Sequence, residues 1–114
     1  MTNYESGANF ERLMRRWLEA GGYVVVRSAG SKSPIDLVAW RENSFAIIQC
    51  KVQKRKISYD DEVAVLQGVV LPRMLGDVER LLFVKNGKSV FMKNVDTGGF
   101  STMTLREVLK ECLR

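Results

Sequence analysis

The sequence predicts a single α/β domain over residues 1–114, in which a mixed central β-sheet is flanked by helices in the order α-β-β-β-α-β-β-α. Three features of the sequence support this fold class. Apolar residues recur with a period of about 3.6 in three segments, short β-branched runs lie between these segments, and turn residues separate the runs. With 114 residues, 46% of them hydrophobic, the chain can build one core.

The N-terminal segment is predicted to form a helix followed by a strand. Apolar residues at helical spacing between Phe10 and Leu18 indicate an amphipathic helix. Ser6 is the expected N-cap of this helix, and Gly21-Gly22 is its expected end. Tyr23–Arg27 is short and β-branched, which predicts the first strand.

The next two strands are expected to form a hairpin in the middle of the sheet. Residues 28–34 have the composition of a loop. Ile35–Trp40 and Phe45–Cys50 are two apolar runs separated by the polar segment 41–44, which is typical of a hairpin. Because both faces of both runs are largely apolar, we expect these strands to be covered on both sides.

The second half of the chain predicts a helix, a hairpin and a final helix. Asp60-Asp61-Glu62 places acids at a helix start, where they favour the helix dipole. The apolar stripe of this helix is expected to include Val63, Leu66, Val69 and Val70, and Pro72 is expected to end or kink it. Leu81–Lys85 and Ser89–Val95 flank Asn86-Gly87, which predicts a type I′ turn, and Thr104 with Glu107 forms a capping box before the last helix.

The composition excludes several kinds of catalysis. The chain has no histidine, which excludes Ser-His-Asp and Cys-His nucleophiles and histidine-based zinc sites. Its two cysteines, Cys50 and Cys112, lie in apolar patterns and are expected to be reduced thiols of an intracellular protein. No apolar run approaches the ~20 residues of a membrane span, and the N-terminus does not resemble a signal peptide. An enzyme of this composition therefore depends on carboxylates, lysine and a hard metal ion.

The charge of the chain permits binding to nucleic acid. Eighteen Lys and Arg residues against thirteen Asp and Glu residues give a net charge of +5. Taken singly, each basic cluster is a solvated face, but two clusters around a candidate metal site favour contact with phosphates. The expected DNA-binding residues are Arg12, Arg15, Arg16, Arg27, Lys32, Lys54, Arg55 and Lys56.

The candidate catalytic residues follow from the register of the predicted hairpin. If Trp40 pairs with Phe45 across the turn, Asp36 lies opposite Gln49. Lys51 is then the diagonal neighbour of Asp36, and it shares a face of its strand with Gln49. One acid, one amide oxygen and one ammonium group are therefore expected to converge at the open end of the hairpin, with Glu11 behind them.

Phosphodiester hydrolysis needs such a set of groups. Magnesium takes oxygen ligands, keeps several waters and is held by one or two carboxylates plus a carbonyl, for which the Cys50 backbone is a candidate. The lysine would orient the attacking water or counter the developing negative charge. Each residue also has a structural interpretation: Asp36 as a turn residue, Gln49 and Lys51 as solvent-facing strand ends, and Glu11 as an exposed helix flank. Their joint occurrence favours catalysis.

The motif and its surroundings resemble a known family. Pro34-Ile35-Asp36, twelve residues, and Gln49-Cys50-Lys51 resemble the signature of PD-(D/E)XK nucleases, whose fold is that of restriction endonucleases. Three segments, GANFERL at 7–13, GYVVVRSAGS at 22–31 and the hairpin at 36–51, resemble the archaeal-type Holliday junction resolvases, and the likeness covers residues 5–56 well.

This resemblance implies a magnesium-dependent endonuclease that acts as a homodimer on four-way DNA junctions, with manganese as a substitute metal and no small-molecule cofactor. It implies that Glu11, Asp36 and Gln49 hold the metal and that Lys51 is the catalytic lysine. It also implies that Arg27 and Ser31 act at the scissile phosphate. The family usually has Glu where this chain has Gln49, so we expect weaker metal binding and a larger role for Glu11. Restriction-type relatives of the Mrr kind resemble this Gln49-Cys50-Lys51 variant and are active, so the resemblance does not imply that Gln49 inactivates the site.

Two alternative functions remain at the level of the sequence. The first is a restriction- or repair-type nuclease that cuts ordinary duplex, although 114 residues leave little room for a separate sequence-reading module. The second is a non-catalytic DNA-binding protein whose nuclease site has decayed through Gln49, although the presence of Asp36, Lys51 and Glu11 argues against decay. Cleavage of a junction in the presence of magnesium distinguishes these functions.

Overall fold

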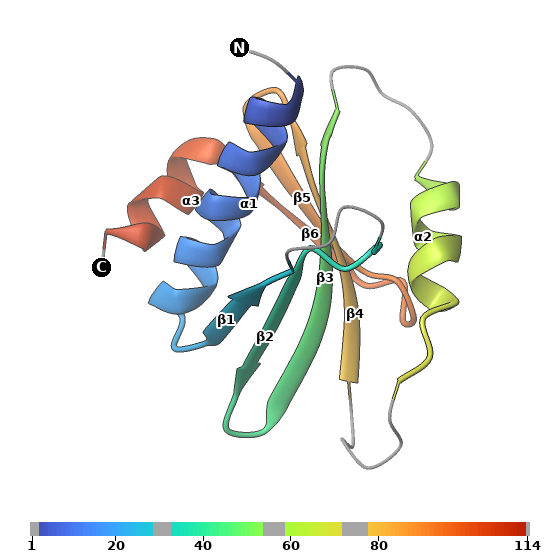
Figure 1. Ribbon diagram of the computed structural model, residues 1–114. Coiled ribbons are helices and arrows are strands. Elements are labelled where there is room, and N and C mark those ends of the chain that lie inside the picture. The colour runs from blue at the N-terminus through green and yellow to red at the C-terminus, as the bar shows by residue number, and fades with distance from the viewer. Residues whose placement is uncertain (1–2, 29–32, 54–58, 72–77, 114) are drawn as a thin grey trace.

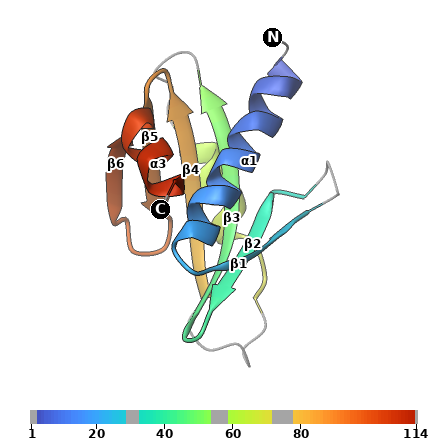
Figure 2. The ribbon, with the colours of Figure 1, turned by 90° about the vertical axis from the view of Figure 1, so that its left-hand side faces the viewer.

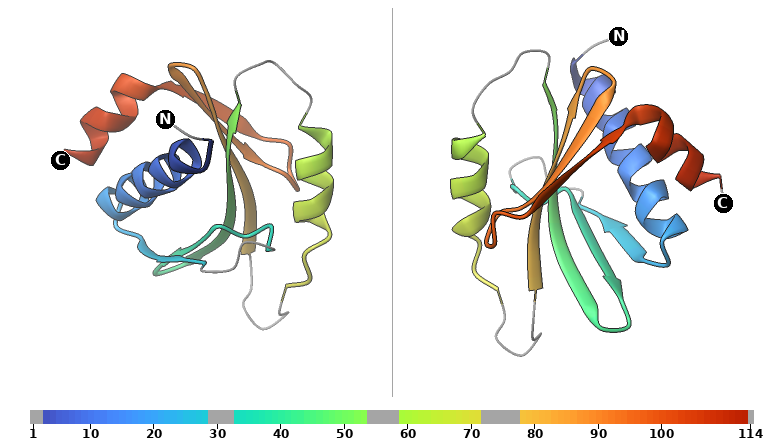
Figure 3. Two further views of the ribbon diagram at one scale, coloured as in Figure 1. Left: turned by 45° about the horizontal axis from the view of Figure 1, so that its top comes forward. Right: turned by 180° about the vertical axis from the view of Figure 1, so that it is seen from behind.

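The computed structural model describes residues 3–28, 33–53, 59–71 and 78–113, and shows a three-layer α/β architecture (Figure 1). Helices α1 and α3 lie on one side of a six-stranded sheet and helix α2 lies on the other, as Figure 3 shows from two further directions. In chain order the elements are α1 (Asn3–Ala20), β1 (Val24–Arg27), β2 (Leu37–Arg41), β3 (Ser44–Gln53), α2 (Asp60–Gln67), β4 (Val78–Asn86), β5 (Ser89–Asn94), β6 (Phe100–Thr104) and α3 (Leu105–Cys112).

The sheet is mixed, as predicted, and has one more strand than predicted. Its order is β1-β2-β3-β4-β5-β6, with β3 and β4 parallel and every other pair antiparallel. The sequence prediction omitted β6. This edge strand is mostly exposed, so it lacks the alternation of apolar and polar residues that marks a half-buried strand.

Each face of the sheet has its own apolar core. Helices α1 and α3 lie side by side over one face (Figure 2), and the core beneath them includes Phe10, Met14 and Leu18 of α1 and Val108 of α3. A hydrogen bond between Trp17 Nε1 and Glu111 joins these two helices. On the other face, Leu66 of α2 packs against strand residues and is fully buried. Alternate residues of β3 belong to the two cores, so this central strand is covered on both sides as predicted.

The prediction of two-sided cover is wrong for β2. Its inward residues Leu37 and Ala39 are fully buried, but Trp40 is 37% exposed. The neighbouring Val24 and Val26 of β1 are also exposed. The reason lies in the position of α2, which packs mainly over β4 and leaves the outer face of β1 and β2 open.

Helix ends differ from the predictions at two places. Helix α1 already starts at Asn3, itself a capping residue type, so Ser6 lies inside the helix. The end at Gly21-Gly22 is confirmed: Tyr23 N donates to Leu18 O, Gly22 N donates to Glu19 O, and Gly22 has a φ of 90°, which together make a Schellman motif.

Helix α2 ends earlier than its apolar stripe suggested. It begins at the acids, as predicted, but its last residue is Gln67 and Gly68 caps it. Val69 and Val70 therefore lie outside the helix, and Val70 is 91% exposed. Glycine at this position ends the helix before the expected stop at Pro72, which lies outside the described residues.

The β4–β5 turn is of a different type from the one predicted. Asn86 pairs with Ser89, so the two turn residues are Gly87 and Lys88. Gly87 has a φ of 61°, whereas no described residue other than glycine has a positive φ. A positive φ at the first turn position alone is the pattern of a type II′ turn, not type I′. The capping box of Thr104 and Glu107 is confirmed, and its hydrogen bonds from Thr104 lower the pKa of Glu107.

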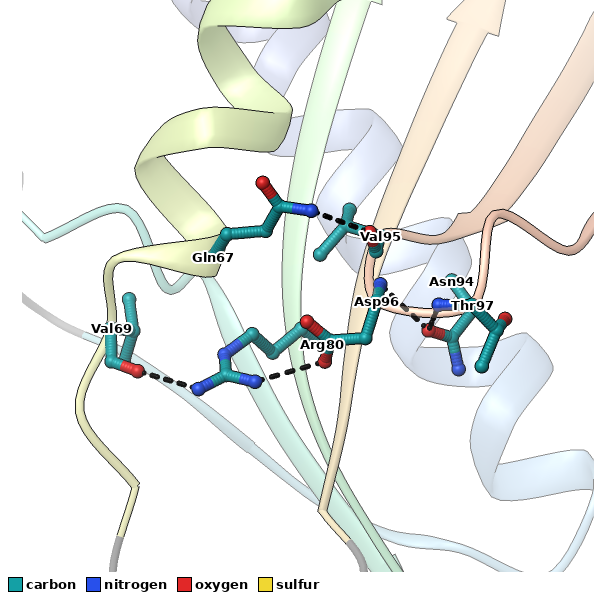
Figure 4. Close-up of polar contacts among 7 residues, drawn as sticks. All are labelled: Gln67, Val69, Arg80, Asn94, Val95, Asp96 and Thr97. Atoms are coloured by element: carbon teal, nitrogen blue, oxygen red, sulfur yellow. Dashed lines mark hydrogen bonds and ion pairs between the residues drawn. The ribbon is translucent and has the colours of Figure 1, made fainter.

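A polar network fixes the C-terminal end of α2 to the sheet (Figure 4). Arg80 of β4 donates to Val69 O and to Asp96 Oδ2, each at 2.9 Å. Gln67 Nε2 donates to Val95 O at 2.8 Å. Because the same guanidinium contacts the segment after α2 and the turn after β5, it connects the helix layer with the sheet.

We expect Arg80→Met to reduce the free energy of unfolding by about 1–3 kcal/mol, because it removes half-buried, charge-assisted hydrogen bonds while keeping the apolar stem. Urea unfolding followed by circular dichroism measures this loss. Arg106→Met, which removes the same charge from an exposed position of α3, is the matched control. Equal unfolding midpoints for the two variants would show that the network does not stabilise the fold.

Candidate active site

The hairpin register places Asp36 at the end of a strand. Trp40 pairs with Phe45 as predicted, and the pairing continues to Leu37 with Ile48. The next pair does not form, because Asp36 N donates to Ile48 O at 2.8 Å. Asp36 and Leu37 thus both lie against Ile48, as in a β-bulge. The expected direct pairing of Asp36 with Gln49 is replaced by this bulge.

The bulge directs the Asp36 carboxylate to the backbone of β3. Asp36 Oδ2 accepts a hydrogen bond from Cys50 N at 2.8 Å, and Asp36 O accepts one from Ser28 N. The side chain thus occupies the edge of β3 where β2 has ended. Burial raises the pKa of Asp36, the Cys50 hydrogen bond opposes this, and the charge of Glu11 raises the pKa further. Two carboxylates whose negative charges repel each other at a half-buried site are a favourable environment for a cation.

Glu11 reaches this place from α1. Its Oε2 accepts a hydrogen bond from Arg27 Nε at 2.9 Å, which also makes an ion pair between α1 and the end of β1. Glu11 is 19% exposed and Arg27 is 39% exposed, so the arginine covers the acid. Burial and the charges of Asp36 and Glu11 raise the pKa of the Cys50 thiol well above its ordinary value, which makes a thiolate nucleophile unfavourable.

The side chains of Gln49 and Lys51 lie on the face of β3 that is turned away from α1. Ile48 and Cys50 belong to the core under α1, so the residues between and after them face α2. Lys51 Nζ lies 3.6 Å from Glu62 Oε1 of α2, and its charge still lowers the pKa of Asp36. Gln49 Oε1 is buried and has no hydrogen-bond partner among the described residues. Gln49 and Lys51 therefore share one face of β3, as predicted, and Asp36 feels the charges of both Glu11 and Lys51, but its direct pairing with Gln49 is absent.

Sequence reasoning missed Glu62. From the sequence it is only one of three acids at a helix start. A signal was present, because Glu62 lies four residues before the buried Leu66 and therefore on the inward stripe of the helix. The exposed Asp60 and Asp61 do not share this spacing.

The groups able to ligate a metal are few. No group of three or more cysteine, aspartate or glutamate residues in the described ranges is placed to hold a metal ion. Glu11 and Asp36 provide two carboxylates, and magnesium is commonly held by one or two with water completing its coordination. The Cys50 backbone carbonyl stays a predicted ligand.

The predicted DNA-binding residues divide into two groups. Arg12, Arg15 and Arg16 are exposed on α1, and their i, i+3, i+4 spacing places them on one face of the helix. Arg15 pairs with Glu19. Burial raises the pKa of the Cys112 thiol of α3, and the nearby charge of Arg16 opposes part of this rise. Lys32, Lys54, Arg55 and Lys56 lie outside the described residues, and so does Ser31, which was predicted to act at the scissile phosphate.

Comparison with known proteins shows the family of the chain. Residues 2–100 match the family described as archaeal Holliday junction resolvase (hjc). The chain belongs to this family. It is similar to the crossover junction endodeoxyribonuclease Hjc of Methanocaldococcus jannaschii, with 33% identity over 89 residues that cover 78% of this chain and 66% of the relative. The match thus spans slightly less than two thirds of the relative's length.

The fold agrees with the same family. The structure of Archaeoglobus fulgidus Hjc, a Holliday junction resolvase from an archaeal hyperthermophile, superposes with a TM-score of 0.61 and 25% identity, over 90% of this chain and 86% of the other. None of the helices that the structure describes is long and apolar enough to cross a membrane. The predicted resemblance to archaeal-type resolvases is therefore confirmed, together with the α/β class of the fold.

Proposed function

We propose that the chain is a structure-specific DNA endonuclease, which resolves four-way junctions by paired, magnesium-dependent hydrolysis of phosphodiester bonds. The observation that carries the proposal is the meeting of Glu11, Asp36 and Lys51 at the open edge of β3, in a chain of the Hjc family. The names of two relatives, a crossover junction endodeoxyribonuclease and a Holliday junction resolvase, support the choice of substrate.

The residues present fit a magnesium ion. Glu11 and Asp36 would hold it, and the buried, unpartnered Oε1 of Gln49 is a third candidate oxygen among the described residues. Bound there, the ion supplies charge for a phosphate oxygen and lowers the pKa of an attacking water. Manganese prefers the same oxygen ligands and is expected to substitute.

The chain's own residues have separate tasks in this proposal. The Cys50 N–H and the bulge hold the Asp36 carboxylate in one orientation. Arg27 holds Glu11 and, as an exposed guanidinium, is placed to contact a DNA phosphate. The Lys51 ammonium counters the negative charge that develops on the phosphate during attack.

A junction assay tests the proposal. A labelled four-way junction with magnesium should yield symmetric nicks in opposing strands, even with excess linear duplex as competitor, and EDTA should stop the reaction. Two nicks need two sites, so we expect a C2 homodimer by light scattering. Equal cleavage of linear duplex would favour a restriction- or repair-type nuclease. Binding without cleavage at any magnesium concentration would favour a DNA-binding protein.

Gln49→Glu should lower the magnesium concentration needed for half-maximal cleavage, because it adds a carboxylate to a position that now offers a neutral amide oxygen. A magnesium titration under single-turnover conditions measures the shift. Asn43→Asp adds the same charge in the exposed β2–β3 turn and is the matched control. Identical titrations for the two variants would show that residue 49 is not a ligand.

A further inference from the structure

The first turn of α2 carries three acids, and only one of them faces the sheet. Asp60 and Asp61 are exposed, whereas the Glu62 side chain is 17% exposed. Glu62 Oε1 lies 3.6 Å from Lys51 Nζ, and Glu62 Oε2 is buried without a hydrogen-bond partner among the described residues. The carboxylate is therefore withdrawn from water on a face where Lys51 is its charged neighbour.

The position of Glu62 is rigidly determined. The next turn of α2 buries Leu66 completely. At the other end of the helix, Gln67 is bonded to Val95 O, and Arg80 is bonded to Val69 O. Helix α2 therefore holds Glu62 in place, because the apolar face and the C-terminal end of the helix are both anchored to the sheet.

Lys51, by contrast, is flexible by nature and has a competing partner. Its side chain is 44% exposed and has four rotatable bonds, which cost conformational entropy to order. Its charge also acts on Asp36, across the edge of β3. An ammonium group that moved fully to Asp36 would neutralise a carboxylate proposed to hold the metal.

We propose that Glu62 is a positioning residue, which holds the Lys51 ammonium on the α2 side of the β3 edge and keeps it available for the scissile phosphate. This inference rests on the proposed function, since it assumes that Lys51 acts in cleavage. Glu62 contacts neither the DNA nor the metal in this arrangement and acts through Lys51. An acid on a second, anchored helix thereby separates the lysine from the metal-binding carboxylates.

Glu62→Gln tests this role, because it keeps the shape of the side chain and removes its charge. Single-turnover junction cleavage should slow by about 10-fold or more, as expected when a reacting group is misplaced. Junction affinity in EDTA and the thermal midpoint should change little, since the amide keeps the packing of the side chain and the Lys51 side chain, 44% exposed, stays in contact with water. Asp61→Asn removes the same charge from the same helix turn and should cleave at the wild-type rate.

Two further measurements distinguish positioning from a general structural effect. In a Lys51→Ala background, Glu62→Gln should cause no additional loss of cleavage, because its effect passes through the missing ammonium. NMR order parameters of the Lys51 side chain should fall in Glu62→Gln and stay unchanged in Asp61→Asn.

The outcomes separate the inference from the proposed function. If Lys51→Ala slows cleavage to a low but measurable rate while Glu62→Gln cleaves like Asp61→Asn, or faster than wild type, the positioning role is wrong and the nuclease stands. The positioning role is equally wrong if Glu62→Gln causes its full loss in the Lys51→Ala background. If Lys51→Ala itself cleaves at the wild-type rate, the assigned role of Lys51 fails, and the role of Glu62 fails with it.

Discussion

Asp36→Asn should abolish junction cleavage and, at neutral pH, make the metal-free fold more stable. Asparagine can still accept the hydrogen bond from Cys50 N through its side-chain oxygen, so the bulge is retained. The variant lacks one of the two carboxylates proposed to hold magnesium. We expect a cleavage rate lower by roughly 1,000-fold or more, which corresponds to several kcal/mol of lost transition-state stabilisation.

The gain in stability follows from the raised pKa of Asp36. Burial is the largest cause of that shift, and the neighbouring Glu11 charge adds to it. A carboxyl group whose pKa is raised in the folded state binds its proton more tightly there than in the unfolded chain. Its contribution to stability is complete below the ordinary pKa of 3.8 and is lost as the pH rises through the higher folded value.

Thermal unfolding in EDTA at several pH values measures both parts of this prediction. The midpoint of Asp36→Asn should exceed that of the wild type at pH 7, and the difference should shrink towards pH 3 because wild-type Asp36 becomes neutral there. Asp61→Asn, at an exposed position, should show no such dependence. A lower midpoint for Asp36→Asn at pH 7 would contradict the unfavourable burial of this charge.

The sequence predicted those parts of the fold that depend on local signals. The register of Leu37–Arg41 follows from a tight turn and two apolar runs, and the structure has it as expected. The end of α1 and the capping box of α3 are likewise set by residues a few positions apart. Strand β6 has no such signal, because it is an exposed edge strand held by pairing with β5.

The sequence predicted that Glu11, Asp36 and Lys51 lie together, and the structure brings them to the open edge of β3, but the predicted pairing of Asp36 with Gln49 is wrong. A strict alternation along two strands placed Asp36 and Gln49 side by side, and one bulge at Asp36 removed that relation. A bulge depends on where β2 loses its partner, which the sequence of the hairpin does not specify. The contact of Lys51 with Glu62 depends on the docking of α2: helical spacing puts Glu62 on the inward face, but it does not specify which strand residue the carboxylate meets.

The structure also explains why Glu11 should contribute more to metal binding here than in a site with three acids. Position 49 carries an amide, so Glu11 and Asp36 are the two acids that interact at this edge. Arg27 bonds Glu11 Oε2 and leaves the other oxygen of the same carboxylate for a cation. The negative charge of the site is therefore divided between two residues, and the loss of either one removes half of it.

Glu11→Gln should accordingly reduce cleavage on the order of 100-fold to 1,000-fold, while its amide oxygen can still accept the hydrogen bond from Arg27. Adding Gln49→Glu to this variant should restore part of the rate and shift the magnesium requirement back towards the wild-type value, because the site regains a second carboxylate. Single-turnover cleavage across a magnesium titration measures both effects. Glu19→Gln, an equal charge change on an exposed position of α1, should cleave like the wild type.

Wild-type cleavage by Glu11→Gln would remove Glu11 from the metal site. A loss in Glu11→Gln that Gln49→Glu fails to relieve at any magnesium concentration would instead place residue 49 outside the reach of the ion, on the α2 face where the structure shows its buried oxygen.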